Sequence, residues 1–174
     1  MATPSAKILV MVCKDFACVK IVGRANFTYG PDFKTLLTEL AQRGYSHFII
    51  DLSECALMDS TFLGILAGFG LKLHQAAAPD QHSVELLNPS SRITDLLDNL
   101  GALHLFKVTS GPLQLPAGVQ TQTPDPSNPT REEITRTCLE AHQSLMAVNP
   151  DNVARFKDVT RFLAEDLKRP GNSP

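Results

Sequence analysis

Residues 48–64 have the sequence FIIDLSECALMDSTFLG, which carries the strongest structural signal in the chain. The short apolar run His47–Leu52 is typical of a buried strand, and we expect a short loop after it. Asp59 and Ser60 then precede a mainly apolar segment, which predicts a helix from Ser60 to about Ala78. Asp and Ser side chains cap free backbone N–H groups at the start of a helix. The segment therefore predicts a strand, a loop and a buried helix.

Similar elements are expected on both sides of this segment. Two β-rich runs joined by Lys14-Asp15 predict a hairpin, and Pro31–Arg43 has apolar residues at helical spacing. The two strands of the hairpin are Lys7–Cys13 and Phe16–Val22. Val84–Leu87 and Leu103–Val108 predict two further strands, with a helix at Ser90–Asn99 between them. The order is β-β-α-β-α-β-α-β. Because single helices between strands require crossovers, this order predicts an α/β sandwich: a mixed, mostly parallel sheet with helices.

The last third of the chain has a different composition. Residues 109–130 contain five of the 12 prolines, which favours an extended linker. Residues 131–168 predict two helices, the first started by the capping box Thr130-Arg131-Glu132-Glu133. Asn149-Pro150 is expected to end the first helix and start the second, with Asn149 as its N-cap and Pro150 at its first helical position. We therefore expect a domain at 7–108, a proline-rich linker at 109–130 and a C-terminal two-helix extension at 131–168.

Each helix of this extension has an apolar face that two short helices cannot bury alone. The faces consist of Ile134, Cys138, Ala141 and Leu145 in the first helix, and of Val153, Phe156, Val159, Phe162, Leu163 and Leu167 in the second. We expect the hairpin to pack on the preceding domain, where it could cover the sheet. A second copy of the chain, giving a homodimer, and another protein are the alternatives.

Composition and charge exclude several classes of function. The formal net charge of −2 and the absence of Trp give neither a basic surface nor a stacking platform for nucleic acid. The N-terminus lacks the pattern of a signal peptide, and the apolar stretch Thr61–Leu73 is too short to span a bilayer. We therefore expect a cytoplasmic protein that makes no direct contact with nucleic acid and does not insert into a membrane.

No pattern in the sequence indicates a metal, cofactor or disulfide. The cysteines show no C-x-x-C spacing, and no two histidines are four residues apart. These residues are Cys13, Cys18, Cys55 and Cys138, and His47, His74, His82, His104 and His142. We expect reduced, mostly buried thiols. Ser60 has no evident His partner in the sequence, and no catalytic set is visible, so an enzyme ranks third among the classes we consider.

The position of Ser60 is also suited to phosphorylation. The dipole and free N–H groups of a helix N-terminus tolerate a phosphate. The added charge would repel a partner from an otherwise weakly charged contact surface. Asp59 is a poor neighbour for a phosphate, but it could orient the hydroxyl during transfer.

The segment IIDLS…MDSTFLGIL, the order of elements and Val84–Ile93 resemble the STAS domain, the family of sulfate-transporter and anti-sigma-factor-antagonist domains. The resemblance covers residues 7–108. It implies a non-enzymatic bacterial signal-transduction protein that regulates transcription by partner switching. Such a protein binds an anti-sigma factor or a serine switch kinase, is released by phosphorylation and is reset by a phosphatase. By position, Ser60 is the implied phosphoacceptor, Asp59 its flanking acid and Thr61 a secondary acceptor.

Two residues depart from the family pattern. Phe62 replaces the usual Gly after Asp-Ser-x, and we expect it to enlarge the surface beside Ser60. Asn26 stands where antagonists tend to have an acid. The expected partner-binding residues are Asn26, Phe27, Thr28, Asp59, Ser60, Thr61 and Phe62, together with the exposed face of the following helix. The Asn26 change mildly favours an alternative, an accessory STAS subunit that docks on the ATPase of a lipid-transport ABC complex.

Overall fold

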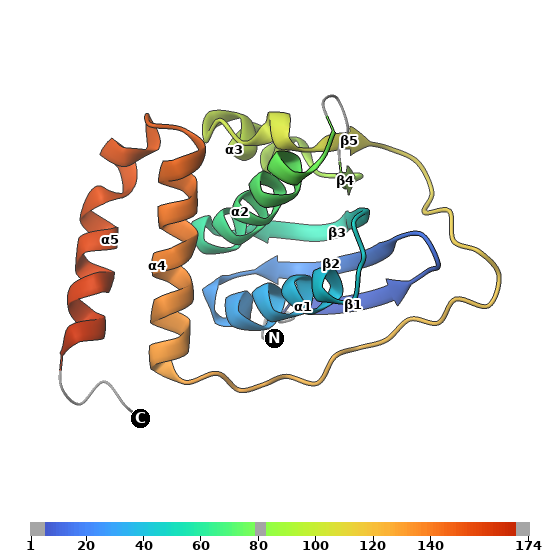
Figure 1. The fold of residues 1–174 in the computed structure, drawn as a ribbon, viewed down its shortest axis with the longest axis horizontal. Helices are drawn as coiled ribbons and strands as arrows, with labels where there is room; N and C mark the ends of the chain where they lie inside the picture. Colours follow the sequence, from blue (N-terminus) through green and yellow to red (C-terminus); the bar gives the residue numbers. More distant parts are fainter. Residues whose placement is uncertain (1–5, 79–82, 170–174) are drawn as a thin grey trace.

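A computed structural model describes residues 6–78 and 83–169. His82 and most of the N-terminal segment considered as a signal peptide lie outside these ranges. A five-stranded sheet in the order β1-β2-β3-β4-β5 forms the centre (Figure 1). Its strands are β1 (Lys7–Val12), β2 (Ala17–Ala25), β3 (Phe48–Met58), β4 (Val84–Leu87) and β5 (Lys107–Thr109). Strands β1 and β2 pair antiparallel and the other three neighbouring pairs are parallel, so the mixed, mostly parallel α/β fold is confirmed.

Helices lie between the strands along the chain, and the buried core lies between helices and sheet. These elements are the short 3-10 helix η1 (Phe27–Tyr29), α1 (Gly30–Gln42), α2 (Ser60–Ala76), α3 (Ser91–Asn99) and the 3-10 helix η2 (Leu103–Leu105). In the core, the aromatic rings of Phe33 and Phe62 are stacked, with 4.2 Å between their centroids. Both side chains are fully buried. Thus α2 is fixed to α1 as well as to the sheet.

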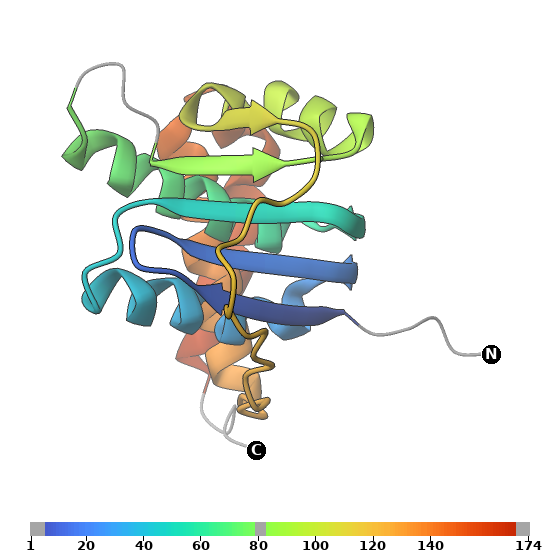
Figure 2. The same ribbon diagram turned by 90° about the vertical axis from the view of Figure 1, so that its right-hand side faces the viewer.

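The proline-rich segment crosses the other face of the sheet (Figure 2). Val10 and Gln122 exchange two backbone hydrogen bonds of 2.8 Å, which form an isolated bridge to β1. The side chain of Asn88 also donates to the Gly111 carbonyl at 2.8 Å and accepts from its N–H at 2.9 Å. The segment therefore covers the face that the helices leave open.

Three local expectations are wrong. Strand β3 continues to Met58 where a loop was expected, because β2 remains paired with it across two register shifts. The expected last strand begins as η2, and β5 has only three residues. Asn149 ends the preceding helix and its side chain accepts from the Asp151 N–H at 3.0 Å, so the last helix starts only at Asn152.

Two C-terminal helices form the expected extension, α4 (Arg131–Val148) and α5 (Asn152–Lys168). The capping box of α4 is confirmed by two hydrogen bonds between Thr130 and Glu133, of 2.7 and 3.1 Å. Helix α4 packs across α2 and α1, and α5 lies on the outer side of α4 (Figure 1). The hairpin therefore packs on the preceding helices of its own chain and does not cover the sheet.

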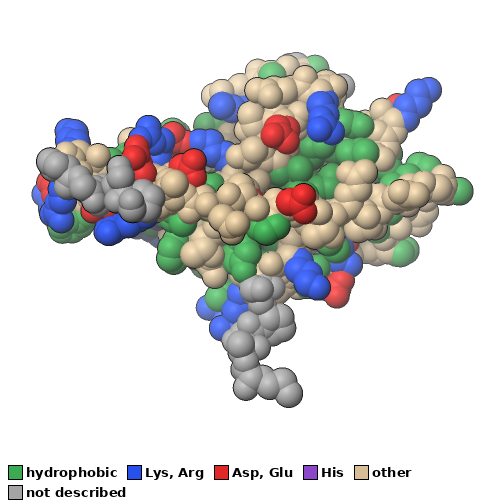
Figure 3. Space-filling view, turned by 90° about the horizontal axis from the view of Figure 1, so that it is seen from below, with side chains coloured by type: hydrophobic (Ala, Val, Ile, Leu, Met, Phe, Trp, Pro, Cys, Tyr) green, Lys and Arg blue, Asp and Glu red, His purple; other side chains and the backbone are tan. Residues whose placement is uncertain are grey.

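The apolar face expected for α5 is only partly correct. Val153, Val159 and Phe162 are exposed, whereas Phe156 packs against the core. The difference arises because α5 packs mainly on α4, so its outer side, with these three residues, faces outward. On the face of the molecule seen in Figure 3, charged side chains of both signs are interspersed. This face agrees with the near-neutral net charge of the chain.

Candidate functional site

Asp59 joins two parts of the candidate site. As the N-cap of α2, its Oδ1 accepts from the Phe62 N–H at 2.9 Å, which confirms the predicted cap. Its Oδ2 accepts from the Phe27 N–H at 2.6 Å, so the carboxylate also holds η1 against the helix start. Asn26 caps η1 in turn, since its Oδ1 accepts from the Thr28 N–H at 3.0 Å. These bonds bring the segments 26–28 and 59–60 together.

Ser60 pairs with a residue of the C-terminal hairpin. Its Oγ lies 2.9 Å from Nε2 of His142, which is buried in α4. The other ring nitrogen, Nδ1, lies 2.6 Å from the Cys138 carbonyl oxygen. Because a carbonyl only accepts, Nδ1 carries the proton, and Nε2 accepts from the Ser60 hydroxyl. The His partner that the sequence did not reveal is thus 82 residues away along the chain.

Ser60 and His142 have the arrangement of a nucleophile and its base. A backbone carbonyl, and not a carboxylate, orients the imidazole. The cavity between α1, α2 and α4 does not have Ser60 or His142 among its lining residues. The hydrogen bond also links α4 to the start of α2.

Two of the expected partner-binding side chains, Thr61 and Phe62, are buried. Phe62 is fully buried against Phe33, so the expectation that it enlarges the surface beside Ser60 is wrong. The reason is its position in the first turn of α2, where it points into the core. Thr61 is 4 % exposed and faces Cys138 of α4. The exposed part of the site is formed by Phe27, which is 48 % exposed, and Thr28.

The contact between Thr61 and α4 also determines the chemistry of Cys138. Burial raises the pKa of the Cys138 thiol, a hydrogen bond with Thr61 partly opposes this shift, and the charge of Asp59 adds to it. The thiol is therefore protonated and poorly reactive while α4 is in place. All four cysteines are free and buried.

Glycines allow α4 to approach α2 closely. A Cβ at Gly64 would lie 2.7 Å from the carbonyl carbon of Ala141, and a Cβ at Gly68 would lie 2.7 Å from Ser144 Oγ. Main-chain atoms of α4 cannot move aside as a side chain can. Even a methyl group at Gly64 would therefore displace the helix. The expected exposed face of α2 is instead the face that α4 covers, which corrects that part of the predicted docking surface.

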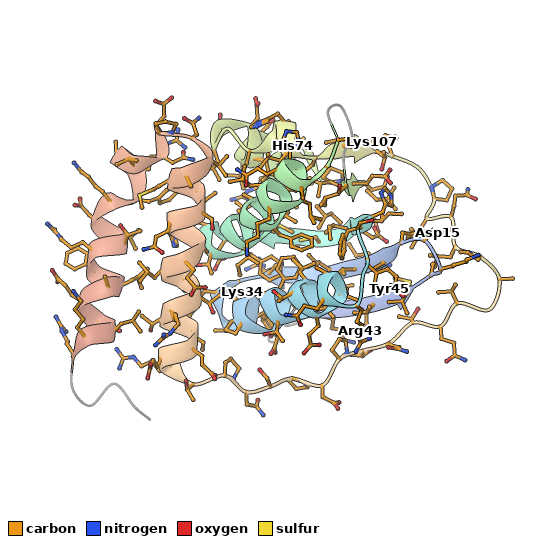
Figure 4. All side chains as sticks on the ribbon, viewed as in Figure 1. Asp15, Lys34, Arg43, Tyr45, His74 and Lys107 are labelled. Atoms are coloured by element: carbon orange, nitrogen blue, oxygen red, sulfur yellow. The ribbon has the colours of Figure 1, made fainter. Side chains whose placement is uncertain are left out.

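A cavity of about 180 Å³ lies beside this contact, between α1, α2 and α4. Lys34 of α1 and Lys72 of α2 both line it. Burial and, next, the charge of Lys72 lower the pKa of Lys34. Glu140 of α4 supplies a carboxylate that forms an ion pair with Lys34, which Figure 4 shows on α1 close to α4. Opposite charges thus face each other across the contact.

The described residues show neither a cluster of metal ligands nor a membrane-spanning helix. No group of three or more His, Cys, Asp or Glu side chains in residues 6–78 and 83–169 is placed to hold a metal ion. Within the same part of the chain, no helix combines the length and the apolar character needed to cross a membrane.

Comparisons with known proteins agree with the architecture. The family model described as "STAS domain" matches residues 7–112. The anti-sigma-B factor antagonist of Staphylococcus epidermidis is 30% identical over 97 residues, which cover 56% of this chain and 86% of the relative.

Solved structures are similar in fold at low sequence identity. A Thermotoga maritima protein proposed as an anti-sigma factor antagonist has a TM-score of 0.51 at 16% identity, covering 63% of this chain and 86% of that protein. The phosphorylated Bacillus cell fate determinant SpoIIAA has a TM-score of 0.47 at 19% identity, with 57% and 87% of the two chains covered. The matches cover at most 63% of this chain.

Proposed function

The chain belongs to the STAS domain family, and from that membership we propose that it is a regulatory protein of the anti-sigma factor antagonist type. It binds a protein partner, an anti-sigma factor or a serine switch kinase. Phosphorylation of Ser60 ends the binding, and a phosphatase restores it. In this role it takes part in signal transduction that regulates transcription in the bacterial cytoplasm.

The observation that carries the proposal is the joining of segments 26–28 and 59–60 by Asp59. This carboxylate places the exposed Phe27 and Thr28 next to Ser60, so one surface combines an apolar contact with a hydroxyl. A phosphate carries a charge of about −1.5 to −2 at neutral pH. On Ser60 it would lie close to the Asp59 carboxylate, and the combined negative charge would repel a partner bound at Phe27. Asn26 supports the surface as the cap of η1.

Thr61 is a less suitable acceptor in this arrangement. Its side chain is buried against α4, whereas Ser60 is only half-buried at the edge of the same contact. We therefore assign phosphorylation to Ser60 and treat Thr61 as a secondary acceptor that requires α4 to move.

The test is capture of partners by the immobilised full-length chain from an extract of the source bacterium, followed by affinity measurement with the identified partner. Ser60→Ala should bind at least as tightly as the wild type, and Ser60→Asp should bind at least about tenfold more weakly, because the partner meets a fixed charge. Ser91→Asp is the matched control, because Ser91 is also the first residue of a helix with a capped N-terminus but lies in α3. Equal affinity of Ser60→Asp and wild type would contradict the switch.

Phosphopeptide mapping of residues 48–72 from native protein provides a second test. A phosphate on Ser60 is expected in a fraction of the molecules. Co-purification with a membrane ATPase, unaffected by Ser60→Asp, would instead favour the alternative role as an accessory subunit of a lipid-transport ABC complex. That role would also agree with the neutral Asn26.

A further inference from the structure

The contact between the C-terminal hairpin and the rest of the chain holds most of the buried polar side chains of the described residues. Of the six polar or charged side chains buried among the described residues, five belong to the hairpin or lie directly against it. These five are Thr61, Thr135, Thr137, His142 and Asn152. Contacts that form and separate are more polar than permanent cores. The composition therefore points to a contact that opens.

Asn152, at the start of α5, gives a second indication. Its Nδ2 donates to the carbonyl oxygens of Leu100 and Leu145, both at 2.8 Å, and so ties the hairpin to the end of α3. Its buried Oδ1 has no hydrogen-bond partner. An unsatisfied buried acceptor destabilises the closed arrangement, and separation of the hairpin would return it to water.

The connection to the rest of the chain permits such a separation. Residues 110–130 between β5 and α4 contain no helix, and Val10–Gln122 is their isolated bridge to the sheet. The bonds of Asn88 to Gly111 lie at the β5 end of this segment. The hairpin can therefore leave α2 without breaking a ladder of the sheet, as a local opening.

Removal of α4 would uncover a helix-sized surface with a defined chemistry, which we call the α1–α2 groove. It consists of Lys34, Ile65, Gly68 and Lys72, which line the cavity, together with Gly64. The two glycines accept only small side chains, here Ala141 and Ser144. The two lysines require a carboxylate, which Glu140 supplies. Ser60 lies at the end of the same surface, where it contacts His142.

We propose that the α1–α2 groove is a docking surface for a helix of the protein partner, and that the C-terminal hairpin covers it in the resting chain. The partner helix carries small residues opposite Gly64 and Gly68 and a carboxylate opposite Lys34. Docking of this helix displaces α4 and breaks the Ser60–His142 hydrogen bond, so the half-buried Ser60 becomes fully accessible only in the open chain. The identity of the partner, but not the opening, rests on the function proposed above.

Opening is tested with Cys138 as a reporter in the full-length chain. Cys138 is buried at the hairpin contact, whereas Cys18 lies in the sheet core with no exposed surface. Under native conditions, alkylation followed by mass spectrometry should modify Cys138 at least about tenfold faster than Cys18. The leucine of Ala141→Leu cannot fit against Gly64. This variant should increase the alkylation rate of Cys138 by at least about a further tenfold and leave the alkylation rate of Cys18 unchanged. Equal rates at the two cysteines in both proteins would overturn the proposal, because the hairpin would then open only with the whole domain.

Docking is tested with a fluorescein-labelled peptide of residues 130–149, the sequence of α4, added to the full-length chain. Ala141→Leu should bind it at least about tenfold more tightly than the wild type, because the variant has an open groove. Adding Gly64→Ala should abolish this gain, since the new methyl group occupies the space that the peptide backbone needs. The loss would not come from an unfolded α2, because alanine favours a helix more than glycine does. A peptide with Glu140→Lys should also bind weakly.

Two results would overturn the docking surface. One is a reactive Cys138 in Ala141→Leu without any gain in peptide binding. The other is a concentration-dependent dimer of the wild type that Gly64→Ala abolishes, because the occupant would then be the hairpin of a second copy. Neither measurement involves a phosphate, so failure of Ser60→Asp to release a partner would contradict the proposed function alone.

Discussion

The hydroxyl of Ser60, the first residue of α2, donates a hydrogen bond to the imidazole of His142 in α4, with 2.9 Å between Oγ and Nε2. The residue that we propose as the phosphoacceptor is thus held by a segment outside the residues that the family model matches. Access to Ser60 and the position of the C-terminal hairpin are therefore coupled through one side chain.

Removal of this hydrogen bond should loosen the hairpin selectively. Ser60→Ala leaves Nε2 of the buried His142 without a donor, which costs about 1–3 kcal/mol. We expect faster hydrogen exchange in α4 and α5 with little change in β2 and β3. A double-mutant cycle with His142→Ala should give a coupling energy of about 1 kcal/mol. Additive effects of the two substitutions would show that the pair makes no net contribution.

Asp59 should be more important for stability than an ordinary helix cap. Asp59→Ala removes the acceptors of both the Phe62 and the Phe27 N–H groups, so the cost should exceed the about 1 kcal/mol of a single lost cap. Asp59→Asn can still accept one of the two bonds and should be intermediate in urea unfolding. If Asp59→Asn were as destabilising as Asp59→Ala, the second hydrogen bond would be unimportant.

Phe62 should behave as a core residue and not as a contact residue. Phe62→Ala removes a fully buried ring stacked on Phe33 and should lower the free energy of unfolding by about 3–5 kcal/mol. Phe27→Ala removes a half-exposed ring of the same kind, and its effect on stability should stay within about 0.5 kcal/mol. Thermal unfolding of the two variants distinguishes the core role of Phe62 from the surface role of Phe27. Similar melting temperatures of the two variants would contradict this distinction.

Stability should decrease at alkaline pH because of the buried thiols. Burial, aided by the charges of Asp51 and Cys13, raises the pKa of Cys18 from 9.0 to about 12. A folded-state pKa above the unfolded value contributes stability below pH 9, and this contribution is lost as the pH rises from 9 towards 12. Burial raises the pKa of Cys55 to about 11, with the same sign.

Cys18→Ala isolates this contribution from other groups that titrate at high pH. The variant should lose less free energy of unfolding between pH 8 and 11 than the wild type, although it is less stable at neutral pH because it leaves a small cavity. The measurement is urea unfolding at a series of pH values. Parallel curves for variant and wild type would show that folding does not change the pKa of the Cys18 thiol.

Local sequence patterns were sufficient for most of the α/β part. The apolar spacing around Phe33, the cap at Asp59 and the capping box at Thr130 predict elements that the structure contains. Such signals depend on neighbours within a few residues, which the sequence displays directly. The continuation of β3 to Met58 was missed because it depends on pairing with β2, about 30 residues earlier.

The candidate site was predicted as a segment but not as an arrangement. The sequence alone placed Ser60 at a helix start, and the family pattern added its candidate role. Only the tertiary structure decided that Phe62 lies in the core, that the linker crosses the sheet and that α4 covers α2. The glycines of α2 are the physical reason for the last of these. Gly64 and Gly68 appear in the sequence as small residues within an apolar helix, and what packs against them depends on a helix backbone that approaches from more than 70 residues away.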